Sequence, residues 1–165
     1  MSLAAALLLP VPAVAQWEGW DYLFDQEKKP WLELQAQIPP YPKPQNLIEF
    51  EAGAASPHRF YIDSESISVG GDGAVRYTLV VRTAGGATNV SFEGMRCATR
   101  EQKYYATGRI DRSWIRARNP QWRHIEYQEV NQYHWVLYAD FLCKGKVAVK
   151  SPKEALDRFK YGPAG

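Results

Sequence analysis

The fold of this chain is decided by residues 60–97, which read FYIDSESISVGGDGAVRYTLVVRTAGGATNVSFEGMRC. Within them, residues 74–83 alternate apolar and polar side chains, the period-two pattern of a strand with one buried face. The GGDG loop at residues 70–73 supplies the residue types that accept positive φ in a hairpin turn. The segment therefore predicts consecutive antiparallel strands.

Further strands are expected on both sides of this hairpin. The predicted strands cover residues 46–51, 59–63, 66–69, 74–83, 87–97 and 103–110. Val90 and Phe92 are expected to point inward. Gly94, inside one of these strands, predicts a bulge, because an interior glycine weakens a regular strand.

The hydrophobic period changes after Pro120. Apolar and aromatic side chains recur at i, i+3 and i+4 over residues 131–143, which predicts a helix. Ser151, Pro152 and Glu154 form a helix start, and that helix is expected to end at Gly162. The fold class predicted is α+β, an antiparallel β-sheet meander with C-terminal helices packed on one face.

The chain begins with an apolar run that resembles an export signal. The run leads to Ala13-Val14-Ala15, a small-x-small site typical of signal peptidase cleavage, and it is too short to span a bilayer. We therefore expect residues 1–15 to be a signal peptide and the protein to be periplasmic. Residues 16–45 are then an N-terminal arm and Pro-rich connector, and residues 46–165 form a single domain.

The chain has two cysteines, Cys97 and Cys143. In an oxidising compartment two cysteines usually pair, so we expect a disulfide. The loop it closes has about 47 residues, and the chain-entropy model assigns such a loop about 4 kcal/mol. The alternative is a redox-active pair, which usually needs a Cys-x-x-Cys motif, and the sequence has none.

No residue pattern points to catalysis. The sequence contains no G-x-S-x-G motif, and His58, His124 and His134 do not have metal-ligand spacing. Residues 62–73 carry acidic turn residues but lack the 12-residue frame of a calcium loop. We therefore expect a non-enzymatic protein with no catalytic, cofactor-binding or metal site.

One cluster does indicate binding. It interleaves basic and aromatic residues: Arg96, Arg100, Lys103, Arg109, Arg112, Arg116, Arg118 and Arg123 with Tyr104, Tyr105, Trp114 and Trp122. Such interleaving is typical of nucleic-acid binding, but export argues for an anionic envelope partner instead. The alternative is a solvated sheet face with core aromatics. We take Arg109, Arg112, Arg116 and Arg118 as the candidate surface for an anionic partner.

Several stretches together resemble a known family. They are PWLE, PPYPKPQNLIEF, FYIDSESISVGGDGAVRYTLVV, GATNVSFEGMRCATREQKYYATGR and LYADFLC. In this order they resemble the CNP1-like family of exported proteobacterial proteins over about residues 31–160. The resemblance implies an envelope protein with two paired cysteines and no established activity. A weaker similarity to surface-adhesin E-like proteins also implies an antiparallel sheet with helices packed on it.

The sequence thus leads to two functional hypotheses. The first is a non-enzymatic exported binding or envelope-assembly protein, whose partner is an envelope protein or an anionic envelope component. We expect no nucleic acid as partner and no transmembrane segment. The alternative is an adhesin-like surface protein that binds host or matrix proteins.

Overall fold

The computed structural model describes residues 30–53, 56–127 and 132–162. The chain divides into two compact units, Met1–Trp31 and Leu32–Gly165, and the first has only Pro30 and Trp31 among the described residues. The predicted signal peptide therefore lies outside the described residues. Everything below concerns the second unit.

The second unit is built on one antiparallel sheet. Its main strands follow the order β1 (Leu47–Phe50), β2 (Arg59–Asp63), β4 (Ala74–Arg82), β5 (Thr88–Arg96), β6 (Glu101–Gly108) and β7 (Trp114–Arg116). The short β3 (Ser68–Val69) pairs with β4, and β8 (Arg123–His124) pairs with β6. Every pairing is antiparallel and neighbours follow chain order, so the predicted meander is confirmed. The 3-10 turn η2 (Pro44–Asn46) precedes β1.

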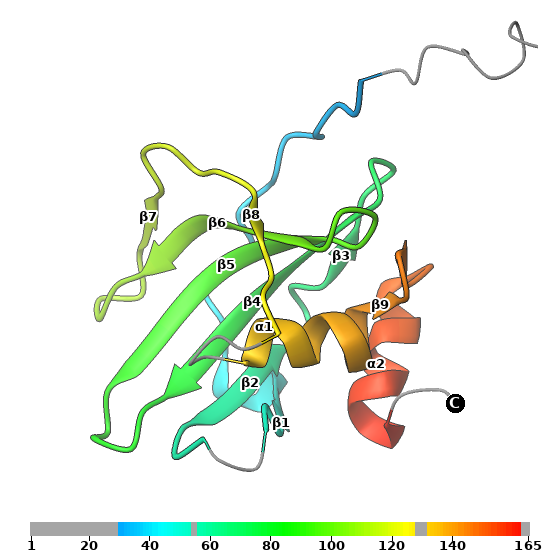
Figure 1. Ribbon diagram of the computed structural model, residues 1–165. Coiled ribbons are helices and arrows are strands. Elements are labelled where there is room, and N and C mark those ends of the chain that lie inside the picture. Colours follow the sequence, from blue (N-terminus) through cyan, green and yellow to red (C-terminus); the bar gives the residue numbers. More distant parts are fainter. Residues whose placement is uncertain (1–29, 54–55, 128–131, 163–165) are drawn as a thin grey trace, which may run out of the picture. The chain divides into compact units, whose positions relative to one another are not determined.

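Helices cover one face of this sheet, as predicted (Figure 1). They are α1 (Tyr133–Val136), the π-helical segment η3 (Leu137–Leu142) that continues it, and α2 (Pro152–Tyr161). A small hairpin, β9 (Cys143–Lys144) and β10 (Val147–Ala148), joins η3 to α2. Ser151 caps α2 by accepting from the Glu154 amide at 3.2 Å. In the part of the chain that the structure describes, no helix has the length and apolar composition needed to cross a membrane.

The main core lies between the sheet and the helices. Every second residue of β4, namely Val75, Tyr77 and Leu79, points into it and is at most 1% exposed. Phe50 of β1 packs edge-on against Phe141 and Phe159, with ring centroids 5.6 Å away in each case. Burial of side chains of this size stabilises a fold by about 1.5–3 kcal/mol each.

The opposite face of the sheet is buried as well. The sequence predicted one buried face for β4, but Arg76, Thr78 and Val80 on its other side are also at most 5% exposed. Val90 and Phe92 belong to two smaller apolar clusters on this second face. These clusters are completed by side chains from two segments: Ala36, Ile38 and Tyr41, and Trp114 and Trp122. We call residues 32–43 the arm segment.

The predicted bulge at Gly94 is wrong in its position. Gly94 pairs regularly with Arg76 and Lys103, and the register shifts one step earlier, where Tyr105 is the extra residue in β6. A side chain at position 94 would instead overlap the Tyr105 ring, 2.7 Å from an added Cβ. The glycine therefore makes room for Tyr105 on the second face.

The Cys97–Cys143 disulfide is confirmed. The two Cα atoms are 5.7 Å apart, and each cysteine is 1% exposed. Cys97 directly follows β5 and Cys143 directly follows η3, so the bond joins the sheet to the helical layer.

We predict that replacing both cysteines, C97A/C143A, lowers the free energy of unfolding by about 4 kcal/mol, because the unfolded chain is no longer closed into a loop. Urea denaturation of the variant and of the oxidised and reduced wild-type protein measures this loss. A variant within about 1 kcal/mol of the oxidised protein contradicts the prediction.

Candidate functional site

The basic aromatic stretch identified in the sequence is separated by the fold into different environments. Lys103, Tyr105 and Trp122 lie on the second face of the sheet, under the arm segment. Arg109, Arg112, Arg116 and Arg118 lie in and beside the connection between β6 and β7, and all four are exposed. Arg100 lies elsewhere and donates from Nε to His124 at 3.2 Å.

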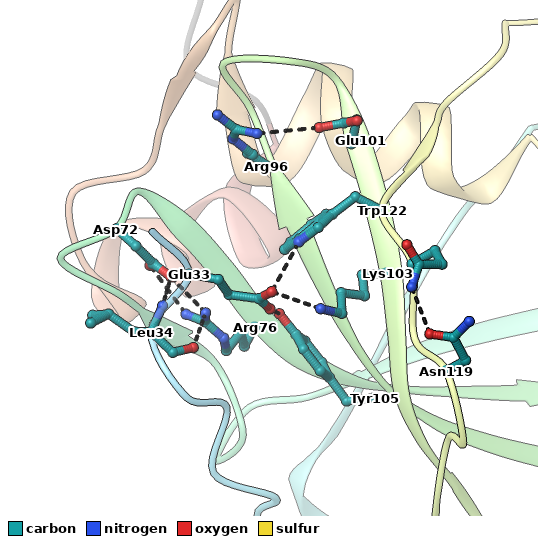
Figure 2. Close-up of polar contacts among 11 residues, drawn as sticks. Glu33, Leu34, Asp72, Arg76, Arg96, Glu101, Lys103, Tyr105, Asn119 and Trp122 are labelled. Carbon is teal, nitrogen blue, oxygen red and sulfur yellow. Dashed lines mark hydrogen bonds and ion pairs between the residues drawn. The ribbon is translucent and has the colours of Figure 1, made fainter. Parts of the chain in front are cut away.

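The arm segment is fastened by the carboxylate of Glu33 (Figure 2). Glu33 Oε2 accepts from Lys103 Nζ at 2.6 Å and from Trp122 Nε1 at 3.2 Å, while Oε1 accepts from the Tyr105 hydroxyl at 2.7 Å. Lys103 and Tyr105 are each only 9% exposed. We call these four residues the Glu33 site.

A second set of contacts holds the backbone next to Glu33. Arg76 forms a forked ion pair with Asp72, at 2.7 and 3.2 Å, and also donates to the Leu34 carbonyl at 2.9 Å. Asp72 in turn accepts from the Leu34 amide at 2.8 Å. A side chain at Gly70 would overlap both Asp72 and Arg76, so this glycine leaves space for the pair.

The remainder of the arm segment is held by aromatic residues. Trp114 donates from Nε1 to the Pro39 carbonyl at 3.0 Å and packs on Tyr41, with ring centroids 5.4 Å apart. Tyr41 donates its hydroxyl proton to the Arg109 carbonyl at 3.1 Å and lies against Gly108. Trp114 and Trp122 therefore bind the protein's own arm segment.

The Glu33 carboxyl is adapted to its cationic surroundings. Burial raises its pKa, but the bonds from Lys103, Tyr105 and Trp122 together outweigh burial, and the pKa lies below the ordinary value of 4.5. For Tyr105, burial and then the bond to Glu33 raise the pKa well above its ordinary value. Glu33 is thus held as a carboxylate and Tyr105 as a neutral donor at neutral pH.

The four candidate arginines are exposed on a turn of defined geometry. The Arg112 amide donates to the Arg109 carbonyl at 3.0 Å, and Arg112 has a φ of 65°. Asp111 accepts from the amide and hydroxyl of Ser113, and these bonds lower its pKa. Ile110 at this turn is fully exposed. We call residues 108–118 the basic hairpin.

The arginines of the basic hairpin differ from the buried cations in their pairing. Lys103 pairs with Glu33, Arg76 with Asp72, and Arg158 with Glu154. Across the described residues, no ion pair joins a carboxylate to Arg109, Arg112, Arg116 or Arg118. Their guanidinium groups are available to an external anion.

A buried polar pair was missed in the sequence. Glu93, which is 0% exposed, accepts from the Ser91 hydroxyl at 2.5 Å and from the Tyr77 hydroxyl at 3.3 Å, and it lies 2.8 Å from His134 Nε2. Because Val90 and Phe92 were expected to point inward, alternation placed Glu93 on the other side of its strand and gave no signal of its burial. The one signal present was His134, which falls on the apolar side of the predicted helix. No group of three metal-ligating side chains gathers anywhere in the described ranges.

The fold and its surfaces define an α+β domain that covers the second face of its sheet with its own arm segment and exposes an arginine-rich hairpin. The chain belongs to the CNP1-like family, whose model matches residues 26–160. No curated protein and no solved structure matches the chain.

We predict that E33Q lowers the free energy of unfolding at neutral pH by about 1–3 kcal/mol, because it removes the charge-assisted bonds of a partly buried carboxylate. The pKa of Glu33 is lower in the folded than in the unfolded state. Its contribution is therefore complete above the ordinary pKa of 4.5 and disappears as the pH falls through the lowered folded value.

Unfolding of wild type, E33Q and a control, E51Q, between about pH 7 and pH 3 measures this difference. Glu51 is exposed and lies in the same unit. The wild type and E33Q should converge in acid. A constant gap at every pH, or an equal loss in E51Q, contradicts the assignment.

Proposed function

We propose that this protein is a non-enzymatic, exported binding or envelope-assembly protein that holds an anionic envelope component at its basic hairpin. The observation that carries the proposal is the set of four exposed arginines without a carboxylate partner among the described residues. The guanidinium group suits this role, because its planar fork binds carboxylate and phosphate oxygens in pairs.

The shape of the basic hairpin supports the same role. Residues 108–118 contain four arginines and one aspartate, so the hairpin carries an excess of positive charge, and Oδ1 of that aspartate accepts from Ser113. The hairpin lies at the edge of the sheet, since β7 is the last strand in the order. Ile110 and Ile115 are exposed beside the arginines and add apolar contact area for a partner.

Binding without catalysis is supported by the placement of the acid–base groups. Glu93 and His134 have the types and the spacing of an acid–base pair, but Glu93 is 0% exposed and His134 5% exposed. A substrate must come within hydrogen-bond reach of such a group. Full burial supports a structural role for this pair.

Export is supported by two features of the chain. The buried Cys97–Cys143 disulfide is of the kind that persists in oxidising compartments. The apolar run before Ala15 has the length and the cleavage site of a signal peptide. We propose a periplasmic location, with mature protein that begins at Gln16. N-terminal sequencing of the protein released by osmotic shock should start at Gln16; full-length protein in the cytoplasmic fraction contradicts export.

We predict that changing Arg109, Arg112, Arg116 and Arg118 to Gln weakens binding to an anionic envelope fraction by roughly fourfold or more, since four exposed ion pairs at about 0.2–1 kcal/mol each contribute about 0.8–4 kcal/mol. Wild-type binding should also weaken as salt is raised, because salt screens exposed charges. Retention on immobilised envelope extract in a salt gradient measures both effects.

The matched control changes four exposed lysines to Gln: Lys144, Lys146, Lys150 and Lys160. This variant has the same change in net charge but an intact basic hairpin. It should bind within about twofold of wild type. Equal losses in the two variants indicate non-specific attraction to net charge, and unchanged binding in the arginine variant rejects the hairpin as the site.

A further inference from the structure

The helical side of the sheet has a cavity whose lining includes no residue of the Glu33 site and none of the four arginines of the basic hairpin. The cavity has a volume of about 360 Å³, within the lower part of the range for small-molecule sites. Strands β2, β4, β5 and β6 form its floor, next to the start of α1. Its described lining residues are His58, Phe60, Leu79, Val81, Thr83, Asn89, Val90, Ser91, Tyr104, Thr107 and Tyr133. We call this cavity the sheet pocket.

The sheet pocket combines an apolar floor with neutral polar groups. Phe60, Leu79 and Val81 belong to the main core or pack against it, and the Tyr133 ring lies 5.3 Å from the Phe60 ring. Around them stand hydroxyl, amide and imidazole groups of the other lining residues. An apolar surface with a few convergent polar groups is the usual composition of a small-ligand site.

The hydrogen-bonding direction of Ser91 is set by the buried pair beneath it. Its hydroxyl donates to Glu93 Oε1 at 2.5 Å, and the other carboxylate oxygen is occupied by Tyr77 and His134. A serine hydroxyl has one proton and two lone pairs, so Ser91 Oγ can only accept from a ligand. The buried Glu93 therefore also sets the direction in which Ser91 can hydrogen-bond to a ligand.

Other lining groups supply donors. His58 Nδ1 accepts from the Ala84 amide at 3.2 Å, so in the neutral ring the proton is on Nε2, which donates. The Asn89 side chain both donates and accepts. The hydroxyls of Tyr104 and Tyr133 share one hydrogen bond at 2.8 Å, and either can be its donor. The pocket therefore has both hydrogen-bond donors and acceptors next to its apolar floor of aromatic and aliphatic side chains.

From this arrangement we propose that the sheet pocket binds a neutral ring that carries several hydroxyl groups, such as one or two sugar units. Each hydroxyl of such a ring both donates and accepts, which matches the mixed lining. Its C–H face packs against the partly exposed ring of Tyr133, because the negative face of an aromatic ring attracts the slightly positive hydrogens of C–H groups. This site is independent of the proposed anion site.

The test is an NMR titration of the uniformly ¹⁵N-labelled chain with four probes: glucose, maltose, N-acetylglucosamine and, as the charged comparison, glucuronate. Binding of at least one neutral sugar should shift the amides of Asn89, Ser91, Tyr104 and Thr107 saturably. Glucuronate should bind more weakly than the best neutral sugar.

Two substitutions fill the pocket, T107F and V81F. Each should weaken sugar binding by roughly tenfold or more, the loss expected when a ligand pocket is occupied. The matched control, T88F, makes the same change on β5 at an exposed residue outside the pocket lining and should leave binding within about twofold. Near-ultraviolet circular dichroism checks that each variant is folded.

No saturable shift with any neutral sugar overturns the proposal. So does equal or tighter binding of glucuronate, or binding that both folded pocket variants retain. The four-arginine variant separates the two sites, because it should lose the anionic partner and keep the sugar. Loss of sugar binding in that variant assigns the sugar to the basic hairpin and also overturns the proposal.

Discussion

The carboxylate of Glu33 is the contact on which the second face of the sheet depends. Lys103 and Arg76 are buried there, and a buried cation is costly unless it is paired and hydrogen-bonded. Glu33 pairs with Lys103. The backbone of the adjacent Leu34 hydrogen-bonds to both members of the Arg76–Asp72 ion pair. The arm segment and the sheet therefore stabilise each other. The disulfide has the corresponding role on the opposite face, where it joins β5 to the helical layer.

The basic residues fall into two groups, one buried and paired inside the fold and one exposed at the sheet edge. The buried cations Arg76 and Lys103 are paired inside the fold, and their side chains orient the arm segment. The arginines of the basic hairpin are exposed at the sheet edge, with no ion pair to the described carboxylates. A single basic aromatic stretch thus contributes both to stability and to a surface suited to anions. Three of the aromatic residues in this stretch also stabilise the fold, because Tyr105, Trp114 and Trp122 donate hydrogen bonds to the arm segment.

Local patterns in the sequence were sufficient for the meander, the C-terminal helices, the α2 cap and the disulfide, because each depends on residues close together or on cysteine pairing. The second buried layer was not predictable in this way. Arg76 and Thr78 have the polarity of a solvent-facing row, and their cover comes from an arm about 40 residues earlier in the chain. The contacts of Glu33 span 70 to 89 residues. Periodicity describes one strand, and it carries no information on which distant segment covers it. The same holds for Glu93 and His134, whose pairing required the helix to lie across β5.

The division between structural and available arginines is the central claim, and residue-level chemical footprinting tests it most directly. Phenylglyoxal modification, followed by mass spectrometry, reports the reactivity of each arginine with and without the anionic envelope fraction. The account predicts fast modification of Arg109, Arg112, Arg116 and Arg118 in the free protein, and protection of these four when the partner is bound. Arg76 should be slow in both states. Hairpin arginines as slow as Arg76 in the free protein, or protection that falls on other residues, would contradict it.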